Sequence, residues 1–160
     1  MAGKTKKTIL QNDMSSGASK LKALLDAGAD PNTRFEEGIT PLMSASVHGD
    51  VATVEVLIKA GANIELQQDH DGMTALMKAA LWKNTKVAAK LISAGAHINK
   101  TTKKGWTALM YAASADCIET VQILLKAGAD AKIKDDGGKT VLDYAHERGN
   151  AKTVALLSTN

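Results

Sequence analysis

The chain has 160 residues, 44% of them hydrophobic and 23% charged, which is enough for one globular domain with a buried core. No apolar run has the length of a membrane span or the shape of a signal peptide, so we expect a cytoplasmic protein with no membrane partner, or a periplasmic one if a leader was removed. The net charge is only +3, which favours a solvated basic tail over a nucleic-acid-binding surface. A single cysteine, Cys117, excludes an internal disulfide framework.

The apolar residues are mostly small. Aromatic residues make up 3% of the chain, while Ala, Leu, Ile, Val and Met dominate. Small aliphatic side chains let helix backbones approach closely, so the composition favours tightly packed helices.

Two short markers recur along the chain with nearly constant spacing. The first is Gly-Ala followed by Asp, Asn or His, with spacings of 33, 34 and 33, at Gly28, Gly61, Gly95 and Gly128. The second is Gly-x-Thr-x-Leu, with spacings of 34, 33 and 33, at Thr40, Thr74, Thr107 and Thr140. Each of the first three threonines precedes the next Gly-Ala by 21 residues, which places the one extra residue in the loop 67–71. A fixed period of this length predicts a repeat architecture.

The sequence of each unit predicts two helices, and the residues that begin, fill and end them occur in the same order in every unit. The threonine is a natural N-cap, and Pro41 after Thr40 suits a first helical position. The first helix then carries an apolar pair such as Leu42 and Ala45 on one face, and the second carries a stripe such as Val54, Leu57 and Ile58. The glycine of Gly-Ala ends the second helix. One such pair of helices cannot bury its apolar stripe alone, so the units must stack.

The period, Thr-Pro-Leu at 40–42 and Gly-Ala-Asp-x-Asn at 28–32 resemble the ankyrin repeat over about residues 18–158. The resemblance implies an all-α solenoid of stacked helix-turn-helix units with projecting β-hairpin-like loops. We expect a basic N-terminus at 1–7 and one ankyrin-repeat domain at 8–160, with units at about 8–34, 35–67, 68–101, 102–134 and 135–160. Polar residues at stacking positions, Asn12-Asp13 and His146, make the first and last units caps around three full repeats.

The chain departs from the family pattern at two kinds of position. Met43, Met77, Met110 and Asp143 stand where the family has the histidine of Thr-Pro-Leu-His. We expect this change to remove hydrogen bonds between loops and to substitute apolar packing. The usual glycine between the two helices is replaced by Lys83-Asn84 and by Asp116-Cys117, which predicts less favourable turns. The motif Thr-Ala-Leu-Met resembles bacterial members of the ankyrin-repeat family more than animal ones.

Catalytic and metal-binding patterns are missing from the sequence. The one acidic–histidine cluster, Asp69-His70-Asp71, lies in a loop and has no second group of ligands, so a solvated turn explains it better than a metal site. We therefore expect no enzyme activity, no cofactor and no metal.

In ankyrin proteins the loop tips and the first helices line a concave groove, and this resemblance implies a protein-binding surface. The candidate partner-binding residues at these positions are Ile39, Val47, His48, Met73, Leu81, Trp82, Lys103, Lys104, Trp106 and Ser114. Four of these residues are aliphatic or methionine, and we expect them to form an exposed apolar strip together with both tryptophans. An exposed apolar strip favours a partner-binding surface. The four are Ile39, Val47, Met73 and Leu81. The competing interpretation is structural, with Trp106 folded against its loop and Trp82 filling the Lys83-Asn84 turn.

We expect a non-catalytic interaction module, monomeric when free, that binds a folded partner protein through this face. The alternative is a dedicated inhibitor or immunity protein that covers the active site of a partner enzyme. Both would use the same groove. The lack of a second domain or extended linker in the sequence slightly favours the inhibitor.

Overall fold

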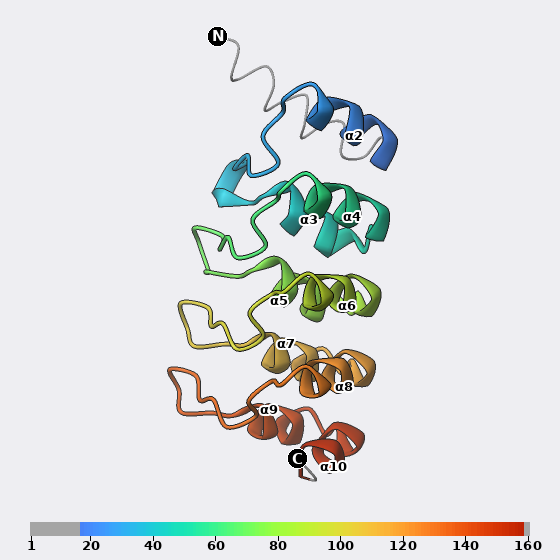
Figure 1. Cartoon of the computed structure of the whole chain (residues 1–160). Helices are drawn as coiled ribbons and strands as arrows, with labels where there is room; N and C mark the ends of the chain where they lie inside the picture. The colour runs from blue at the N-terminus through green and yellow to red at the C-terminus, as the bar shows by residue number, and fades with distance from the viewer. Residues whose placement is uncertain (1–16, 159–160) are drawn as a thin grey trace.

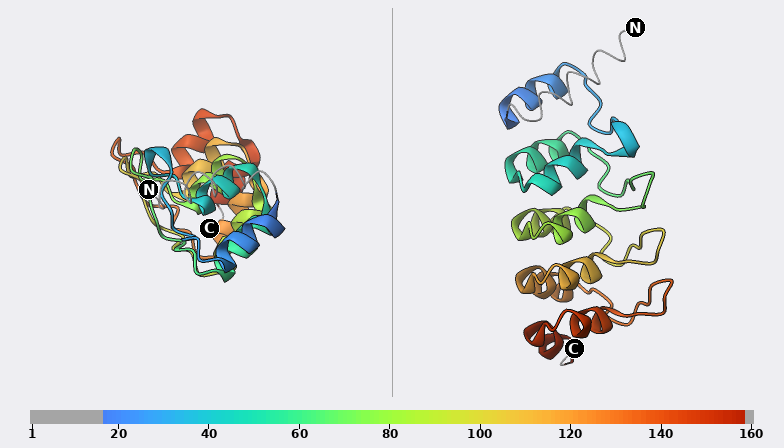
Figure 2. Two further views of the ribbon diagram at one scale, coloured as in Figure 1. Left: turned by 90° about the horizontal axis from the view of Figure 1, so that it is seen from above. Right: turned by 180° about the vertical axis from the view of Figure 1, so that it is seen from behind.

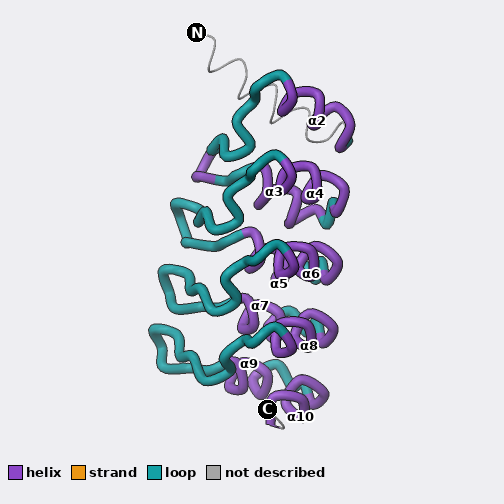
Figure 3. The backbone as a smooth tube through the Cα atoms, in the orientation of Figure 1, coloured by secondary structure: helices purple, strands orange, loops and turns teal. Residues whose placement is uncertain are grey.

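The computed structural model describes residues 17–158, which form helices and loops without a strand (Figure 3). The α-helices are α2 (Ala18–Asp26), α3 (Pro41–His48), α4 (Val51–Lys59), α5 (Ala75–Leu81), α6 (Thr85–Ser93), α7 (Ala108–Ser114), α8 (Ile118–Lys126), α9 (Val141–Glu147) and α10 (Ala151–Ser158). A short 3-10 turn, η2 (Glu36–Gly38), lies between α2 and α3. No helix in 17–158 has the length and apolar character needed to cross a membrane. The basic segment 1–7 and the first-unit cap at Asn12-Asp13 lie outside the described residues.

The helices stack in two columns along one axis (Figures 1 and 2). The first helices of successive units, α3, α5, α7 and α9, pack side by side, and the second helices, α2, α4, α6, α8 and α10, form the other column. The loops between units project from the side of the first helices (Figure 1). The predicted all-α solenoid of helix-turn-helix units is confirmed.

Small side chains make this close stacking possible. Where α5 meets its neighbours, Ala79 and Ala80 are fully buried, as are Ala112 and Ala113 of α7. Larger aliphatic residues of the second helices, such as Leu57 of α4, are also fully buried. Because each unit leaves its stripe to be covered by the next, the core runs continuously through the stack.

Threonine begins three of the first helices as the sequence predicts. The hydroxyl of Thr40 accepts the backbone N–H of Met43 at 3.3 Å, and Thr74 does the same for Met77. The backbone N–H of Thr40 in turn donates to the sulfur of Met43 at 3.5 Å, and that of Thr74 to Met77 at 3.4 Å. Met43 and Met77 therefore do more than the apolar packing we expected, because their sulfur atoms also accept hydrogen bonds.

Each projecting loop closes with a backbone hydrogen bond in the manner of a hairpin. The N–H of Phe35 donates to the carbonyl of Ile39, giving loop 35–39, and the same pattern gives loops 102–106 and 135–139. In loop 68–73 the bond runs from Gln68 to Met73 and spans one residue more. The structure thus confirms that the extra residue is absorbed in the loop, where it leaves the register of the helices unchanged.

The turns between the two helices of a unit require a positive φ. Gly49 supplies it at 70° in the second unit, but Lys83 and Asp116 adopt φ values of 58° and 54° at the corresponding positions. A side chain in this left-handed region is strained, so the prediction of less favourable turns is confirmed. In the last unit His146 is exposed at the position where Ala80 and Ala113 are buried, as expected for a terminal repeat.

Candidate functional site

The side of the stack that carries the loops and the first helices is called here the inner face. It consists of the exposed and half-buried residues of the four loops 35–39, 68–73, 102–106 and 135–139 and of α3, α5, α7 and α9, together with Trp82, which directly follows α5. Backbone hydrogen bonds join neighbouring loops, from Asp69 N to Glu37 O (3.3 Å), from Lys103 N to Asp71 O (3.1 Å) and from Asp136 N to Lys104 O (3.1 Å). These bonds hold the four loops as one ladder, so the inner face is presented as a rigid surface.

Leu81 and Trp82 are the most exposed apolar groups on this face. Leu81 ends α5 with 38% of its surface exposed, and Trp82 follows it with 58% exposed. They are the only large hydrophobic residues in 17–158 that are exposed to this degree. The indole of Trp82 therefore does not fill the turn at Lys83, and the structural interpretation of this residue is wrong.

The expected apolar strip is interrupted at Met73. This residue is only 5% exposed and belongs to the core cluster, so its place in an exposed strip is wrong. Its unbranched side chain is flexible, and from the end of the longer loop 68–73 it packs into the core cluster. Ile39, at the same repeat position, is half-buried and packs against the core, and Val47 is also half-buried.

The second tryptophan belongs to an aromatic cluster. The ring of Trp106 lies 5.0 Å from that of Tyr111 on α7 and 4.4 Å from that of Tyr144 on α9, both at a tilt of 51°. Trp106 is half-buried, so the structural interpretation holds for it in part. The candidate residues did not include either tyrosine. The repeat period would have found them, since one helix position reads Ser44, Lys78, Tyr111 and Tyr144.

Hydrogen bonding fixes the end of this cluster. The phenol of Tyr144 donates to the carboxylate of Asp135, which also accepts the backbone N–H groups of Gly137 and Lys139. The bond from Tyr144 and these N–H groups lower the pKa of Asp135. Desolvation, with the hydrogen bond to Asp135, raises the pKa of Tyr144 to about 12. The phenol is therefore neutral over the physiological range, and its position is locked by the loop.

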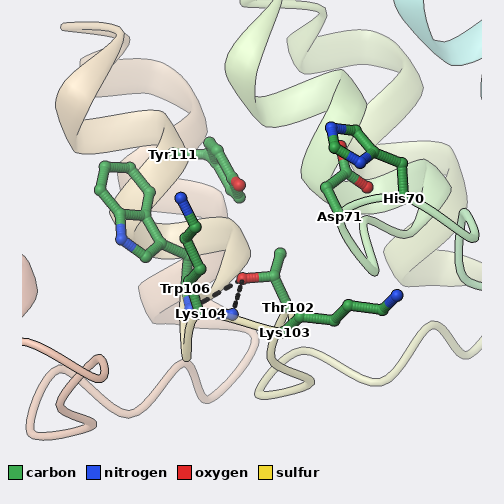
Figure 4. Close-up of a pocket in the computed structure, with 7 residues that line it drawn as sticks. All are labelled: His70, Asp71, Thr102, Lys103, Lys104, Trp106 and Tyr111. Carbon is green, nitrogen blue, oxygen red and sulfur yellow. Dashed lines mark hydrogen bonds between the residues drawn. The ribbon is translucent and has the colours of Figure 1, made fainter.

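A hollow of about 300 Å³ opens beside this cluster, between loops 68–73 and 102–106 (Figure 4). Figure 4 shows Trp106, Lys104 and Tyr111 on one side, with His70 and Asp71 on the other. The complete lining consists of His70, Asp71, Thr102, Lys103, Lys104, Trp106 and Tyr111. Three of the candidate residues, Lys103, Lys104 and Trp106, are thus brought together, whereas Leu81 and Trp82 lie outside this hollow.

The remaining candidates have local roles. His48 is exposed and its Nδ1 lies 2.8 Å from the carbonyl oxygen of Ser44. Ser114 is half-buried, and its hydroxyl accepts from Arg148 at 3.4 Å. Lys78 of α5, which was not among the candidates, is also half-buried, and desolvation lowers its pKa.

The two carboxylates of the acidic–histidine cluster in loop 68–73 are bonded to other groups of the protein. Asp69 accepts from Arg34 at 2.7 Å, and Asp71 accepts the backbone N–H of Met73 at 2.8 Å. No group of three or more potential ligands for a metal ion occurs within 17–158. The sequence predicts a solvated turn in this segment, and Asp69 and His70 are exposed in it.

The single cysteine lies away from the inner face. Cys117 immediately precedes α8 and is 5% exposed, with its sulfur 3.1 Å from the hydroxyl of Thr120. In this position it is enclosed by the turn between α7 and α8, and it offers no nucleophile to the hollow.

Stacked two-helix units, a ladder of loops and a rigid inner face define a helical-repeat solenoid. A family model described as ankyrin repeats (3 copies) matches residues 14–102 and, a second time, residues 90–160. The chain belongs to the ankyrin-repeat family. Ankyrin repeats are generally non-catalytic modules for protein–protein interaction.

Proposed function

We propose that this protein is a non-catalytic interaction module that binds a folded partner protein through its inner face. The observation that carries the proposal is the exposure of Trp82, with 58% of its surface open beside a 38% exposed Leu81. Every other large apolar residue in 17–158 is buried or half-buried. A soluble monomer gains nothing from exposing these two side chains, whereas a bound partner would remove them from water.

The composition of this patch fits an interface centre. Tryptophan is enriched among residues whose truncation weakens binding by roughly 2 kcal/mol or more, because it buries a large area with few rotatable bonds. The patch is followed by the charged Lys83, and the exposed imidazole of His48 lies at the position equivalent to Trp82 one repeat earlier. An apolar centre with a polar surround is the usual arrangement of a protein–protein interface.

The rigidity of the surface also supports a binding role. The loops are joined by backbone hydrogen bonds, and the side chain of Gln67 adds bonds to the carbonyl groups of Gly72 (2.7 Å) and Thr101 (2.9 Å). A surface that is ordered before binding loses little conformational entropy on association. The inner face is therefore suited to recognising a folded partner without rearrangement.

The proposal is tested by affinity capture from the native cell extract with the purified protein as bait. We compare wild type with Trp82→Ala, and with Lys86→Ala as a control at an exposed position of α6 in the other helix column. We expect one specific partner whose affinity falls about thirtyfold with Trp82→Ala and is unchanged with Lys86→Ala. Equal capture by both variants, at equal melting temperatures, would refute the choice of surface.

The same experiment separates an adaptor from an inhibitor. If the captured partner is an enzyme, its activity is measured with increasing amounts of wild type and of Trp82→Ala. Stoichiometric loss of activity with wild type identifies an inhibitor, and unchanged activity in the saturated complex identifies an interaction module.

A further inference from the structure

We propose that the hollow between loops 68–73 and 102–106 receives an aliphatic side chain of the partner next to an acidic residue, whose carboxylate pairs with Lys104. The inference rests on the proposed function and adds the chemistry of the segment that is recognised. Three properties of the hollow carry it: its size, its aromatic wall and the charge at its rim.

The size of the hollow fits side chains rather than a whole ligand. Its volume of about 300 Å³ is at the lower end of the range of small-molecule pockets, which is roughly 300–1,000 Å³. It lies between two loop tips on the surface of a single-layer stack (Figure 4). One or two side chains projecting from a larger partner would fill such a space, while the partner's own surface would cover the opening.

The wall of the hollow is aromatic and fixed in position. Trp106 packs against Tyr111, and it is supported from behind by Tyr144 at 4.4 Å. The hydroxyl of Thr102 accepts the backbone N–H of Trp106 at 3.0 Å and that of Lys104 at 3.4 Å, which holds the loop that carries the indole. The indole of Trp106 contacts both tyrosine rings, and the Tyr144 ring already faces the ammonium of Lys139 at 5.5 Å. Such a wall favours an aliphatic side chain.

The rim of the hollow has an excess of positive charge. Lys103 and Lys104 are both exposed, and Asp71 is the one carboxylate in the lining. Lys103 donates to the backbone carbonyl of Asp69, whereas Lys104 forms no ion pair with any residue in 17–158. In Figure 4 the Lys104 side chain lies beside Trp106, at the edge of the apolar wall. A carboxylate next to the inserted aliphatic group would therefore find an unpaired ammonium within reach.

The surrounding loops favour a protein segment over a nucleic acid. Aromatic rings and lysines would also suit a single strand, but such a strand needs a continuous positive track. The loops on both sides carry carboxylates, at Glu36, Glu37, Asp69, Asp71, Asp135 and Asp136. A phosphate backbone crossing these loops would be repelled. The positive charge of loop 102–106 is local and matches one or two carboxylates.

The test is selection of random linear peptides displayed on phage, with the purified full chain as target. Selected peptides are synthesised and their affinities measured for wild type, Lys104→Glu and Lys86→Glu. The last variant makes the same change of charge at an exposed residue of α6. We expect enriched peptides to carry Leu, Ile or Val beside Asp or Glu, and to bind Lys104→Glu about five- to tenfold more weakly, with no loss for Lys86→Glu.

Two further measurements make the result decisive. Replacing the peptide's acidic residue with Lys should restore binding to Lys104→Glu, because the charges are then exchanged across the same contact. Labelled oligothymidylate should not compete with the peptide. The inference is overturned if no acidic–aliphatic sequence is enriched, if both lysine variants bind equally, or if oligothymidylate competes. If in that case Trp82→Ala still fails to capture the partner that wild type captures from the extract, the proposed function is retained and only the inference about the hollow is rejected.

Discussion

The two turns without glycine give a prediction whose size follows from the backbone. Lys83 and Asp116 have φ values of 58° and 54°, where the corresponding residue in the second unit is Gly49. A side chain in this region destabilises the folded state by roughly 1–2 kcal/mol, and replacing the residue with glycine removes that strain. Glycine also makes the unfolded chain more flexible, which reduces the gain in stability by about 0.5–1 kcal/mol. Both side chains are exposed. We therefore expect Lys83→Gly to raise the free energy of unfolding by about 0.5–1 kcal/mol, and Asp116→Gly to raise it by less, because an Asp side chain tolerates this region better than a Lys side chain does.

The assay is thermal unfolding followed by circular dichroism. For a chain of this length Lys83→Gly should raise the melting temperature by about 1–4 °C and Asp116→Gly by less, and the double variant should show about the sum, since the turns are one repeat apart. The matched control is Lys86→Gly, which places glycine at an exposed position inside α6 and should lower stability by about 1 kcal/mol. If Lys83→Gly lowered the melting temperature as Lys86→Gly does, the reasoning about turn strain would be refuted.

Three other changes test the loops and the turns. Gly105→Ala should lower the free energy of unfolding in urea by about 2–4 kcal/mol, because the new Cβ would lie 2.8 Å from the Cα of Asp135. The control Gly138→Ala has open space around its Cβ and should lower it by only about 1 kcal/mol. Equal losses for the two variants would contradict this. Asn84→Ala should cost about 1–3 kcal/mol, since the amide donates to two carbonyl oxygens of α3 at 2.8 Å, and an unchanged midpoint would argue against that link. An ultraviolet titration should show Tyr144 ionising near pH 12, with the folded state losing stability as the pH rises above 10; ionisation near 10 would disprove the bond to Asp135.

The repeat pattern was sufficient to predict the fold and much of its detail. The threonine caps, the loop that absorbs the extra residue and the strained turn at Lys83 all follow from comparing equivalent positions along the chain. These features are local, because each depends on a few neighbouring residues and on the fixed period.

The arrangement of the site was harder to predict, because it depends on contacts between units. Met73, Trp106 and Ile39 occupy equivalent positions, yet Met73 enters the core while Trp106 packs on tyrosines from two helices. Sequence position fixes the place of the backbone, but the size and shape of each side chain decide how far it is buried. The aromatic cluster and the hollow beside it therefore appeared only in the structure.

The central claim is that the inner face, with Trp82 exposed on it, is where a partner protein binds. The most direct measurement is site-specific photo-cross-linking in the native extract, with the photoreactive residue at position 82 or, as the control, at position 86 on α6. We expect one discrete cross-linked partner from position 82 and none from position 86. Cross-linking of the same partner from position 86 alone would contradict it.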